Sequence, residues 1–74
     1  MNKTYFDPDE RSQIRDMIRD MLKRNSHLLF PNEEQFLKQV NTLLKKKQGL
    51  TTKQQDWLMK IIEKIHYEKN YQAA

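Results

Sequence analysis

Residues 36–65, FLKQVNTLLKKKQGLTTKQQDWLMKIIEKI, decide the fold of this chain. Apolar side chains recur every third or fourth residue on both sides of a polar centre, which is the spacing of two amphipathic helices. Gly49, the only glycine in the chain, follows three consecutive lysines and Gln48, so we expect it at the C′ position of the first of these helices, where a positive φ is favoured. Only about three residues then join the two helices, which predicts an antiparallel hairpin over about residues 33–69.

A further helix is predicted before the hairpin, over about residues 8–24. Asp7 can accept hydrogen bonds from the first turn, Pro8 suits the first helical position, and Glu10 completes a capping box. Apolar residues then follow at helical spacing: Ile14, Met17, Ile18, Met21 and Leu22. Together these elements predict an all-α fold, a single small domain over residues 1–74 with three helices and a C-terminal antiparallel helical hairpin.

The two hairpin helices carry start signals of their own. Asn32 and Gln35 have the spacing of a capping box, which predicts that the second helix starts at Asn32. Residues 51–52 are both threonine and are followed by glutamines at 54–55, which predicts the cap of the third helix. The apolar run 28–30 precedes a proline, which restricts Phe30 to extended conformations, and we expect the run to cover the core as a connector.

Composition limits the class of protein. Seventy-four residues form one domain at most. The absence of cysteine excludes a disulfide framework and thiolate metal sites, and it favours a reducing compartment. The first residues lack the apolar core of a signal peptide, and no apolar run approaches the ~20 residues of a membrane span. We therefore expect a cytoplasmic protein without membrane contact.

Positive charge is concentrated in the second half of the chain. Residues 1–37 carry six Lys and Arg and seven Asp and Glu, for a net charge of −1. Residues 38–74 carry eight lysines and three acids, for a net charge of +5. Segregated positive charge of this kind indicates a polyanionic or acidic partner for the second half.

No group of residues has the pattern of an active site. Asp16 and Asp20 share a helix face, but neighbouring arginines and lysines favour exposed ion pairs over acid–base catalysis. Glu63 and His66 have the spacing of a metal-binding pair and lack further ligands. A chain with one glycine has no glycine-rich phosphate loop. We therefore expect a protein that is not an enzyme and uses no cofactor or metal.

The basic tip of the hairpin is the first candidate binding site. Lys45, Lys46, Lys47 and Lys53 lie close together in the sequence, and Thr51 adds a hydroxyl group. The N-terminus of the third helix contributes N–H groups, which attract phosphate. The alternative interpretation is a solvated charge cluster at a helix end.

A stripe along the third helix is the second candidate. Its members recur every third or fourth residue: Lys53, Trp57, Lys60, Lys64, Tyr67 and Tyr71. In one interpretation the lysines bind phosphates while the aromatic rings stack on bases. In the other, Trp57 packs in the core on Phe36 or Val40, the lysines surround it as a solvated rim, and the tyrosines cover the first helix.

These two surfaces give the predicted nucleic-acid-binding residues: Lys45, Lys46, Lys47, Thr51, Lys53, Trp57, Lys60, Lys64 and Tyr67. Arg11 and Arg15 of the first helix would extend the phosphate track, although nearby acids favour an ion-paired surface there. The four methionines are too scattered in the sequence to predict a Met-rich recognition groove.

Residues 36–61 also carry a turn signature, in which a Lys-rich helix end is followed by Gly-Leu-Thr, Lys-Gln and Trp-Leu. In this respect the second half of the chain resembles a helical hairpin of phage and bacterial DNA-processing proteins. It is similar in particular to the small companion or C-terminal helical module of the UvsW-type recombination and repair helicase of T-even phages. The resemblance implies a non-enzymatic accessory of a superfamily 2 helicase acting on branched DNA, with single-stranded DNA as a ligand, in the cytoplasm of the host cell.

We therefore expect a DNA-binding accessory module that contacts single-stranded or branched DNA through its basic hairpin and supports a helicase in phage recombination and DNA repair. The alternative is a protein–protein interaction module without direct nucleic-acid contact, which docks on a larger enzyme or an acidic regulator through the aliphatic seam of the hairpin. A homodimer that completes a thin core is a further alternative.

Overall fold

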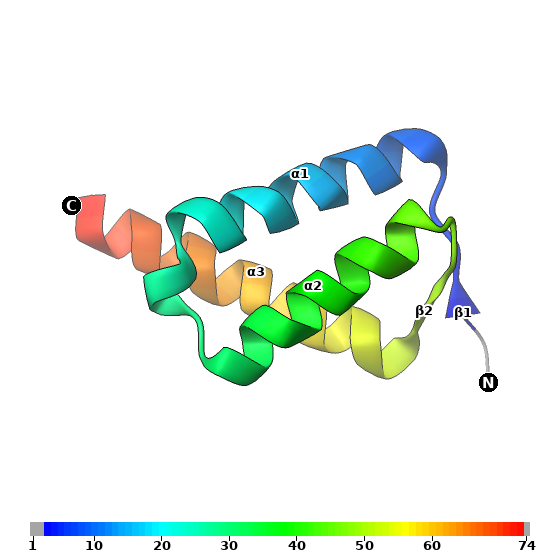
Figure 1. Ribbon diagram of the computed structural model, residues 1–74. Helices are drawn as coiled ribbons and strands as arrows, with labels where there is room; N and C mark the ends of the chain where they lie inside the picture. Colours follow the sequence, from blue (N-terminus) through cyan, green and yellow to red (C-terminus); the bar gives the residue numbers. More distant parts are fainter. Residues whose placement is uncertain (1–2, 74) are drawn as a thin grey trace.

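Three α-helices and one short antiparallel sheet form the fold of the described residues (Figure 1). The computed structural model describes residues 3–73, with the side chains of residues 3–68. In chain order the elements are β1 (Lys3–Thr4), α1 (Pro8–Arg24), the 3-10 turn η1 (Ser26–Leu28), α2 (Pro31–Lys45), β2 (Leu50–Thr51) and α3 (Thr52–Ala73). The all-α fold class predicted from the sequence is confirmed.

α1 begins at the predicted signature. Oδ1 of Asp7 accepts the N–H of Glu10 at 2.8 Å, and Oε1 of Glu10 accepts the N–H of Asp7 at 3.1 Å. Pro8 occupies the first helical position. A cap of this kind stabilises a helix start by about 1 kcal/mol relative to alanine at the cap.

α2 begins earlier than predicted. Phe30 is the residue before the helix, Pro31 is its first residue, and Oε1 of Glu33 accepts the N–H of Phe30 at 2.8 Å. The predicted cap at Asn32 is therefore wrong, because the proline takes the first helical position and the helix starts earlier in the chain. Leu28 and the residue after it pack partly on the core, as expected of the connector, whereas Phe30 is exposed.

α2 ends in a Schellman motif whose left-handed residue is Lys47. The N–H of Gln48 donates to the carbonyl of Leu43 at 2.9 Å, and the N–H of Lys47 donates to that of Leu44 at 3.0 Å. Lys47 has a φ of 61°, the region that glycine usually occupies at this position. Gly49 has no positive φ, so its predicted role is wrong; the helix has already ended when the chain reaches it.

The connection between α2 and α3 exceeds the predicted length of about three residues because it contains β2. β1 pairs with β2 in antiparallel register, with Lys3 opposite Thr51 and Thr4 opposite Leu50. Gly49 lies directly against β1, since a Cβ atom here would come within 2.8 Å of the carbonyl oxygen of Thr4. Close approach of the backbone is therefore the reason for glycine at this position.

α3 begins with the predicted capping box. Oγ1 of Thr51 accepts the N–H of Gln54 at 3.2 Å, and Oε1 of Gln54 accepts the N–H of Thr51 at 2.9 Å. α3 then runs back past α2 and crosses it at an angle, while α1 lies alongside α2 (Figure 1). The two strands, the start of α1, the end of α2 and the start of α3 meet at one end of the molecule, which we term the strand end.

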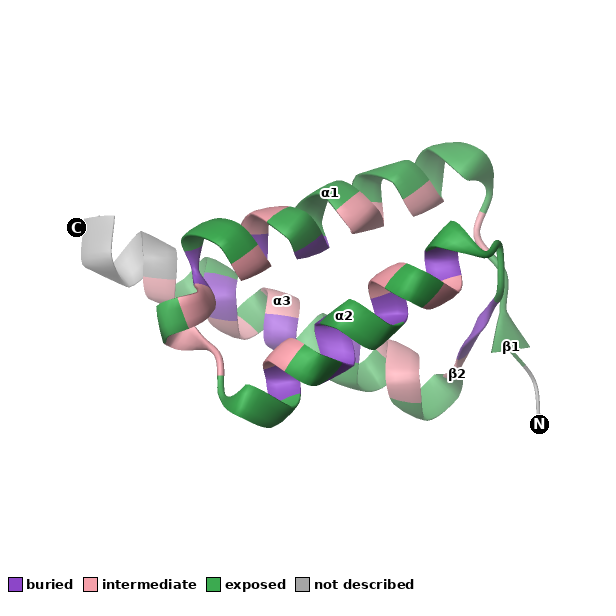
Figure 2. Cartoon of the chain, in the orientation of Figure 1, coloured by how far each residue is buried: buried purple, intermediate pink, exposed green. Residues whose placement is uncertain are grey.

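The core lies where the three helices face one another (Figure 2). Its buried apolar residues are Ile18, Met21, Phe36, Leu37, Val40, Leu44, Leu50, Leu58, Ile61 and Ile65. Leu50 of β2 is fully buried, so the small sheet closes the core at the strand end. Within the described part of the chain, no helix has the length and apolar character needed to span a membrane.

Candidate nucleic-acid interface

A hollow with basic walls lies between the first half of α1 and the end of α2. Its walls are formed mainly by Arg11, Ser12 and Arg15 from α1, by Leu44 and Lys45 from the end of α2, and by Lys47 from the turn that follows α2. Four of these side chains carry a positive charge, and none of the lining residues carries a negative one. We term this site the basic hollow; it joins cations that lie far apart in the sequence.

Both arginines of the basic hollow are held by neutral groups. Nη1 of Arg11 donates to the carbonyl oxygen of Phe6 at 3.1 Å. Nε of Arg15 donates to Oδ1 of Asn41 at 3.2 Å, across the contact between α1 and α2. These bonds position each guanidinium without neutralising it and leave further N–H donors for an anion. The same planar group can form paired hydrogen bonds with phosphate oxygens.

Lys47 enters the basic hollow from an unfavourable backbone conformation. The left-handed region costs an L-residue roughly 1–2 kcal/mol, and glycine is the usual solution at C′. The chain instead places an exposed lysine there, with a φ of 61°. Strain of this kind is often retained where the side chain has a role, and here the side chain adds charge to the hollow.

The remaining predicted residues of the hairpin tip lie at the strand end and are not among the residues that line the basic hollow. Lys46 and Lys53 are exposed, and β1 adds Lys3 opposite Thr51. The hydroxyl oxygen of Thr51 accepts the N–H of Gln54, so this N–H is committed to the cap of α3 and is not available to a ligand. Of the four predicted tip lysines, Lys45 and Lys47 line the basic hollow, and the cap reduces the expected contribution of open N–H groups.

Acidic residues also lie near the start of α1. Oxygens of Asp7 and Glu10 accept each other's backbone N–H groups, which commits them to the helix cap. Asp9 is exposed in the same turn, and none of the three lines the basic hollow. These carboxylates lower the net charge of the strand end while the hollow itself stays positive.

Trp57 belongs to the packing between α2 and α3. Its ring stacks on that of Phe36, with the ring centroids 4.2 Å apart and an angle of 23° between the planes. The residue remains 36% exposed. Of the two interpretations of Trp57, the structure therefore supports the one in which it packs on Phe36, since one face of the indole is covered by protein.

Lys64 is bound within the protein. Its Nζ atom lies 2.6 Å from Oε1 of Glu33 and 4.7 Å from the centroid of the Phe30 ring. An ammonium group with these two partners is held in place by both. A phosphate at Lys64 would have to compete with a carboxylate that is itself largely buried.

Lys60 and Tyr67 are exposed on α3. A rise of about 1.5 Å per residue places Tyr67 about 20 Å along the helix from Lys53. The predicted stripe therefore does not form one compact site with the strand end. The side chain of Tyr71 lies outside the described residues.

The structure thus groups two of the predicted tip lysines, Lys45 and Lys47, with Arg11 and Arg15, which the sequence suggested only as an extension. The signal for these arginines was present in their spacing of four residues along the edge of the apolar stripe. What the sequence did not reveal is that α1 lies beside the end of α2. In the described part of the chain, no group of three or more His, Asp or Glu side chains has the arrangement of a metal site.

Comparison of the chain with protein-family models, with curated proteins and with solved structures finds no match. The resemblance to a helicase companion module therefore stays a prediction, and the functional interpretation rests on the geometry of the basic hollow.

Proposed function

We propose that this chain is a non-enzymatic nucleic-acid-binding module whose basic hollow binds the phosphate backbone. The observation that carries the proposal is the grouping of Arg11, Arg15, Lys45 and Lys47 around one hollow without a carboxylate among the lining residues. Both arginines keep their full charge because their hydrogen-bond partners are neutral oxygens. A cluster of this kind neutralises phosphates and releases condensed counterions, which supplies most of the affinity in backbone recognition.

The proposed mode of binding reads the backbone and not the bases. Stacking on bases needs an aromatic ring with an accessible face at the binding groove. The ring of Trp57 is stacked on Phe36, and Tyr67 lies far along α3 from the strand end. Contacts to phosphate position a protein on nucleic acid without carrying sequence information. We therefore expect affinity with little dependence on base sequence.

Single-stranded or branched DNA is the ligand that we propose, in support of a helicase that acts in recombination and repair. This part of the proposal rests on the resemblance of the hairpin turn, and the basic hollow is compatible with it. The chain contributes a phosphate-binding surface, and the helicase would supply the ATPase.

Fluorescence anisotropy with a labelled single strand and with a labelled fork of the same sequence tests the proposal. We expect binding that weakens steeply between about 50 and about 200 mM salt, with a log–log slope of about −0.7 for each phosphate neutralised on a single strand. Replacing Arg11 and Arg15 with glutamine should reduce the steepness of this slope by about 1.4, the value for two phosphates.

The matched control replaces two arginines on the same helix that lie outside the basic hollow. Arg19 and Arg24 are exposed and pair with Asp16 and Asp20, at 2.6 and 3.3 Å. Their change to glutamine removes the same formal charge and should leave the salt slope close to that of the wild type. Equal losses in the two double variants would show that net charge, and not the hollow, determines binding.

A further inference from the structure

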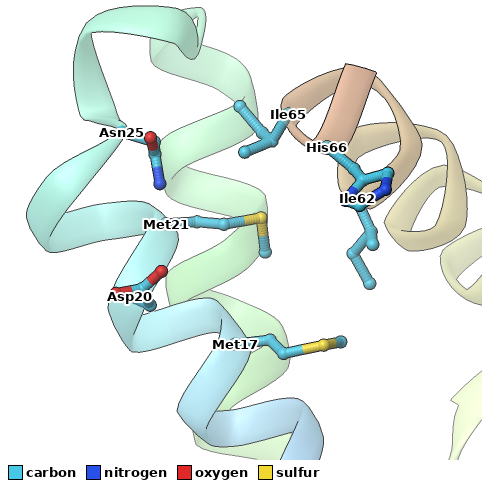
Figure 3. A pocket seen from close by; sticks show the side chains of 7 residues that line it. All are labelled: Met17, Asp20, Met21, Asn25, Ile62, Ile65 and His66. Carbon is cyan, nitrogen blue, oxygen red and sulfur yellow. The ribbon is translucent and has the colours of Figure 1, made fainter. Parts of the chain in front are cut away.

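A second pocket lies between α1 and α3 (Figure 3). Its residues on α1 belong to the second half of that helix, away from the strand end. Its apolar walls come from Met17 and Met21 on α1 and from Ile62 and Ile65 on α3. The polar residues Asp20, Asn25 and His66 complete the lining. This pocket brings together two of the methionines that looked scattered in the sequence. The pocket shares no lining residue with the basic hollow, and α1 rises by about 14 Å from Arg15 in the hollow to the helix end at Arg24.

Asn25, the C-terminal cap of α1, also lines this pocket and carries an unused hydrogen-bond donor. The residue is only 6% exposed, and its Nδ2 atom has no hydrogen-bond partner among the described residues. The amide nitrogen points along α1 toward Met21 (Figure 3). Buried polar atoms without a partner are rare in native proteins, and each needs an explanation. A ligand that brings an acceptor oxygen into the pocket would satisfy this donor.

The size of the pocket indicates what it can hold. Its volume is about 130 Å³, whereas sites for cofactors and other small molecules usually measure about 300–1,000 Å³. A space of this size accepts one apolar side chain. In a polypeptide every side chain is flanked by carbonyl oxygens, which are the acceptors that Asn25 lacks. A hydrocarbon tail would fill the apolar space and leave the donor unpaired.

The surroundings of the pocket extend its apolar surface. Met17 is 41% exposed at the pocket, and Met59, one turn before Ile62 on the same side of α3, is 50% exposed. Exposed methionines on neighbouring helices form adaptable contact surfaces for protein partners. We propose that this pocket receives one apolar side chain of a partner polypeptide, of about the size of leucine, whose adjacent carbonyl oxygen accepts a hydrogen bond from Nδ2 of Asn25.

Titration of the full chain with two blocked amino acids tests this inference by NMR. The chain carries ¹³C-labelled methionine methyl groups and a ¹⁵N-labelled side-chain amide at Asn25. N-acetyl-leucine N-methylamide has both the side chain and the carbonyl groups, and we expect saturable shifts of Met17, Met21 and the Asn25 amide. N-acetylglycine N-methylamide has the carbonyl groups alone and should leave these resonances unchanged.

The Asn25→Leu variant tests the hydrogen bond separately. Leucine has the same branched shape and the same number of side-chain heavy atoms as asparagine, although it is larger, and it removes the unpaired donor, so the variant should unfold at the same urea concentration as the wild type or a higher one. The affinity for the leucine probe should fall about threefold to tenfold, the value of one hydrogen bond. If the variant fails to fold, the comparison of the leucine and glycine probes on the wild type still shows whether the pocket binds an apolar side chain.

Several outcomes would overturn the inference. These are an absence of shifts with the leucine probe, equal shifts with the glycine probe, and an undiminished affinity in a folded Asn25→Leu variant. Shifts of Met17 and Met21 that depend on protein concentration without any probe would also overturn it, because a second copy of the chain would then occupy the pocket. Loss of DNA binding by the basic hollow has no bearing on this test.

Discussion

The Nζ atom of Lys64 lies 2.6 Å from Oε1 of Glu33, so an ion pair connects α3 to the first turn of α2. The same oxygen accepts the N–H of Phe30 at 2.8 Å, which makes Glu33 both a helix cap and a partner across helices. The side chain of Glu33 is largely buried, whereas the pair between Arg19 and Asp16 on α1 is mostly exposed. Ion pairs of the exposed kind contribute little to stability, whereas removing one partner of a shielded pair leaves a poorly solvated charge and is costly.

Acid should weaken the fold through Glu33. Burial alone raises the pKa of this carboxyl group. The hydrogen bonds from Lys64 and Phe30 and the charge of Lys64 lower the pKa by more than burial raises it, so the pKa lies below its ordinary value. The contribution of the pair is therefore complete above the pKa of the unfolded state, about 4.3, and is lost as the pH falls through the lower pKa of the folded state. In urea denaturation followed by circular dichroism, the urea concentration at the unfolding midpoint should decrease as the pH is lowered below about 5.

The Glu33→Gln variant isolates this effect. Its amide oxygen can still accept the N–H of Phe30, but the charge that pairs with Lys64 is gone. We expect a loss of about 1–3 kcal/mol in the free energy of unfolding at neutral pH and a weaker dependence on acid than in the wild type. Glu34→Gln, at the adjacent and more exposed position, is the control. An acid dependence that Glu33→Gln leaves intact would contradict the assignment.

Gly49→Ala should destabilise the strand end. The added methyl group would lie 2.8 Å from the carbonyl oxygen of Thr4, which is a backbone atom and can move away only if β1 moves. We expect the free energy of unfolding to decrease by about 1–3 kcal/mol, the usual cost of overpacking. Hydrogen exchange at the amides of β1 and β2 should become faster. Gln48→Ala, an exposed neighbouring change, should leave both measurements unchanged; an intact sheet in Gly49→Ala would refute the account.

The sequence predicted those features that depend on residues close together in the chain. The capping boxes of Asp7 with Glu10 and of Thr51 with Gln54 follow from a spacing of three residues, and both are present. The stripe of apolar residues gave the extent of α1 for the same reason. The error at the start of α2 was also local, because two caps competed within a few residues and Pro31 favoured the earlier one.

The features that sequence reasoning missed depend on contacts between distant segments. Nothing in the pattern around Gly49 indicates that the first residues of the chain pair with β2, and a glycine after lysines looks like a helix cap. The basic hollow was missed for the same reason, since Arg11 and Lys47 meet only because α1 lies beside the end of α2. The pocket at Asn25 likewise needs the placement of α3 against α1.

Lys47→Gly should separate the effect of the Lys47 charge on DNA binding from the effect of its left-handed backbone on folding stability. Glycine relieves the left-handed strain at C′ but also increases the conformational entropy of the unfolded chain. We therefore expect the free energy of unfolding to stay the same or to increase by up to about 1 kcal/mol. Lys47→Ala removes the same charge and keeps the strain, which makes it the matched control. Under the proposed function both variants should bind single-stranded DNA more weakly than the wild type, by similar factors. Unchanged affinity in both would exclude Lys47 from the interface.

Replacement of Trp57 should affect stability and leave DNA binding unchanged. Trp57→Ala removes the ring that stacks on Phe36 and should cost about 2–4 kcal/mol, somewhat below the range for a fully buried aromatic residue because the indole is 36% exposed. Trp57→Phe keeps an aromatic stack and should cost less than about 1.5 kcal/mol. Under conditions where each variant is folded, its anisotropy titration with single-stranded DNA should match that of the wild type, and the emission of Trp57 should change little on binding. Strong quenching with loss of affinity in Trp57→Phe would instead show that the exposed face of the indole stacks on a base.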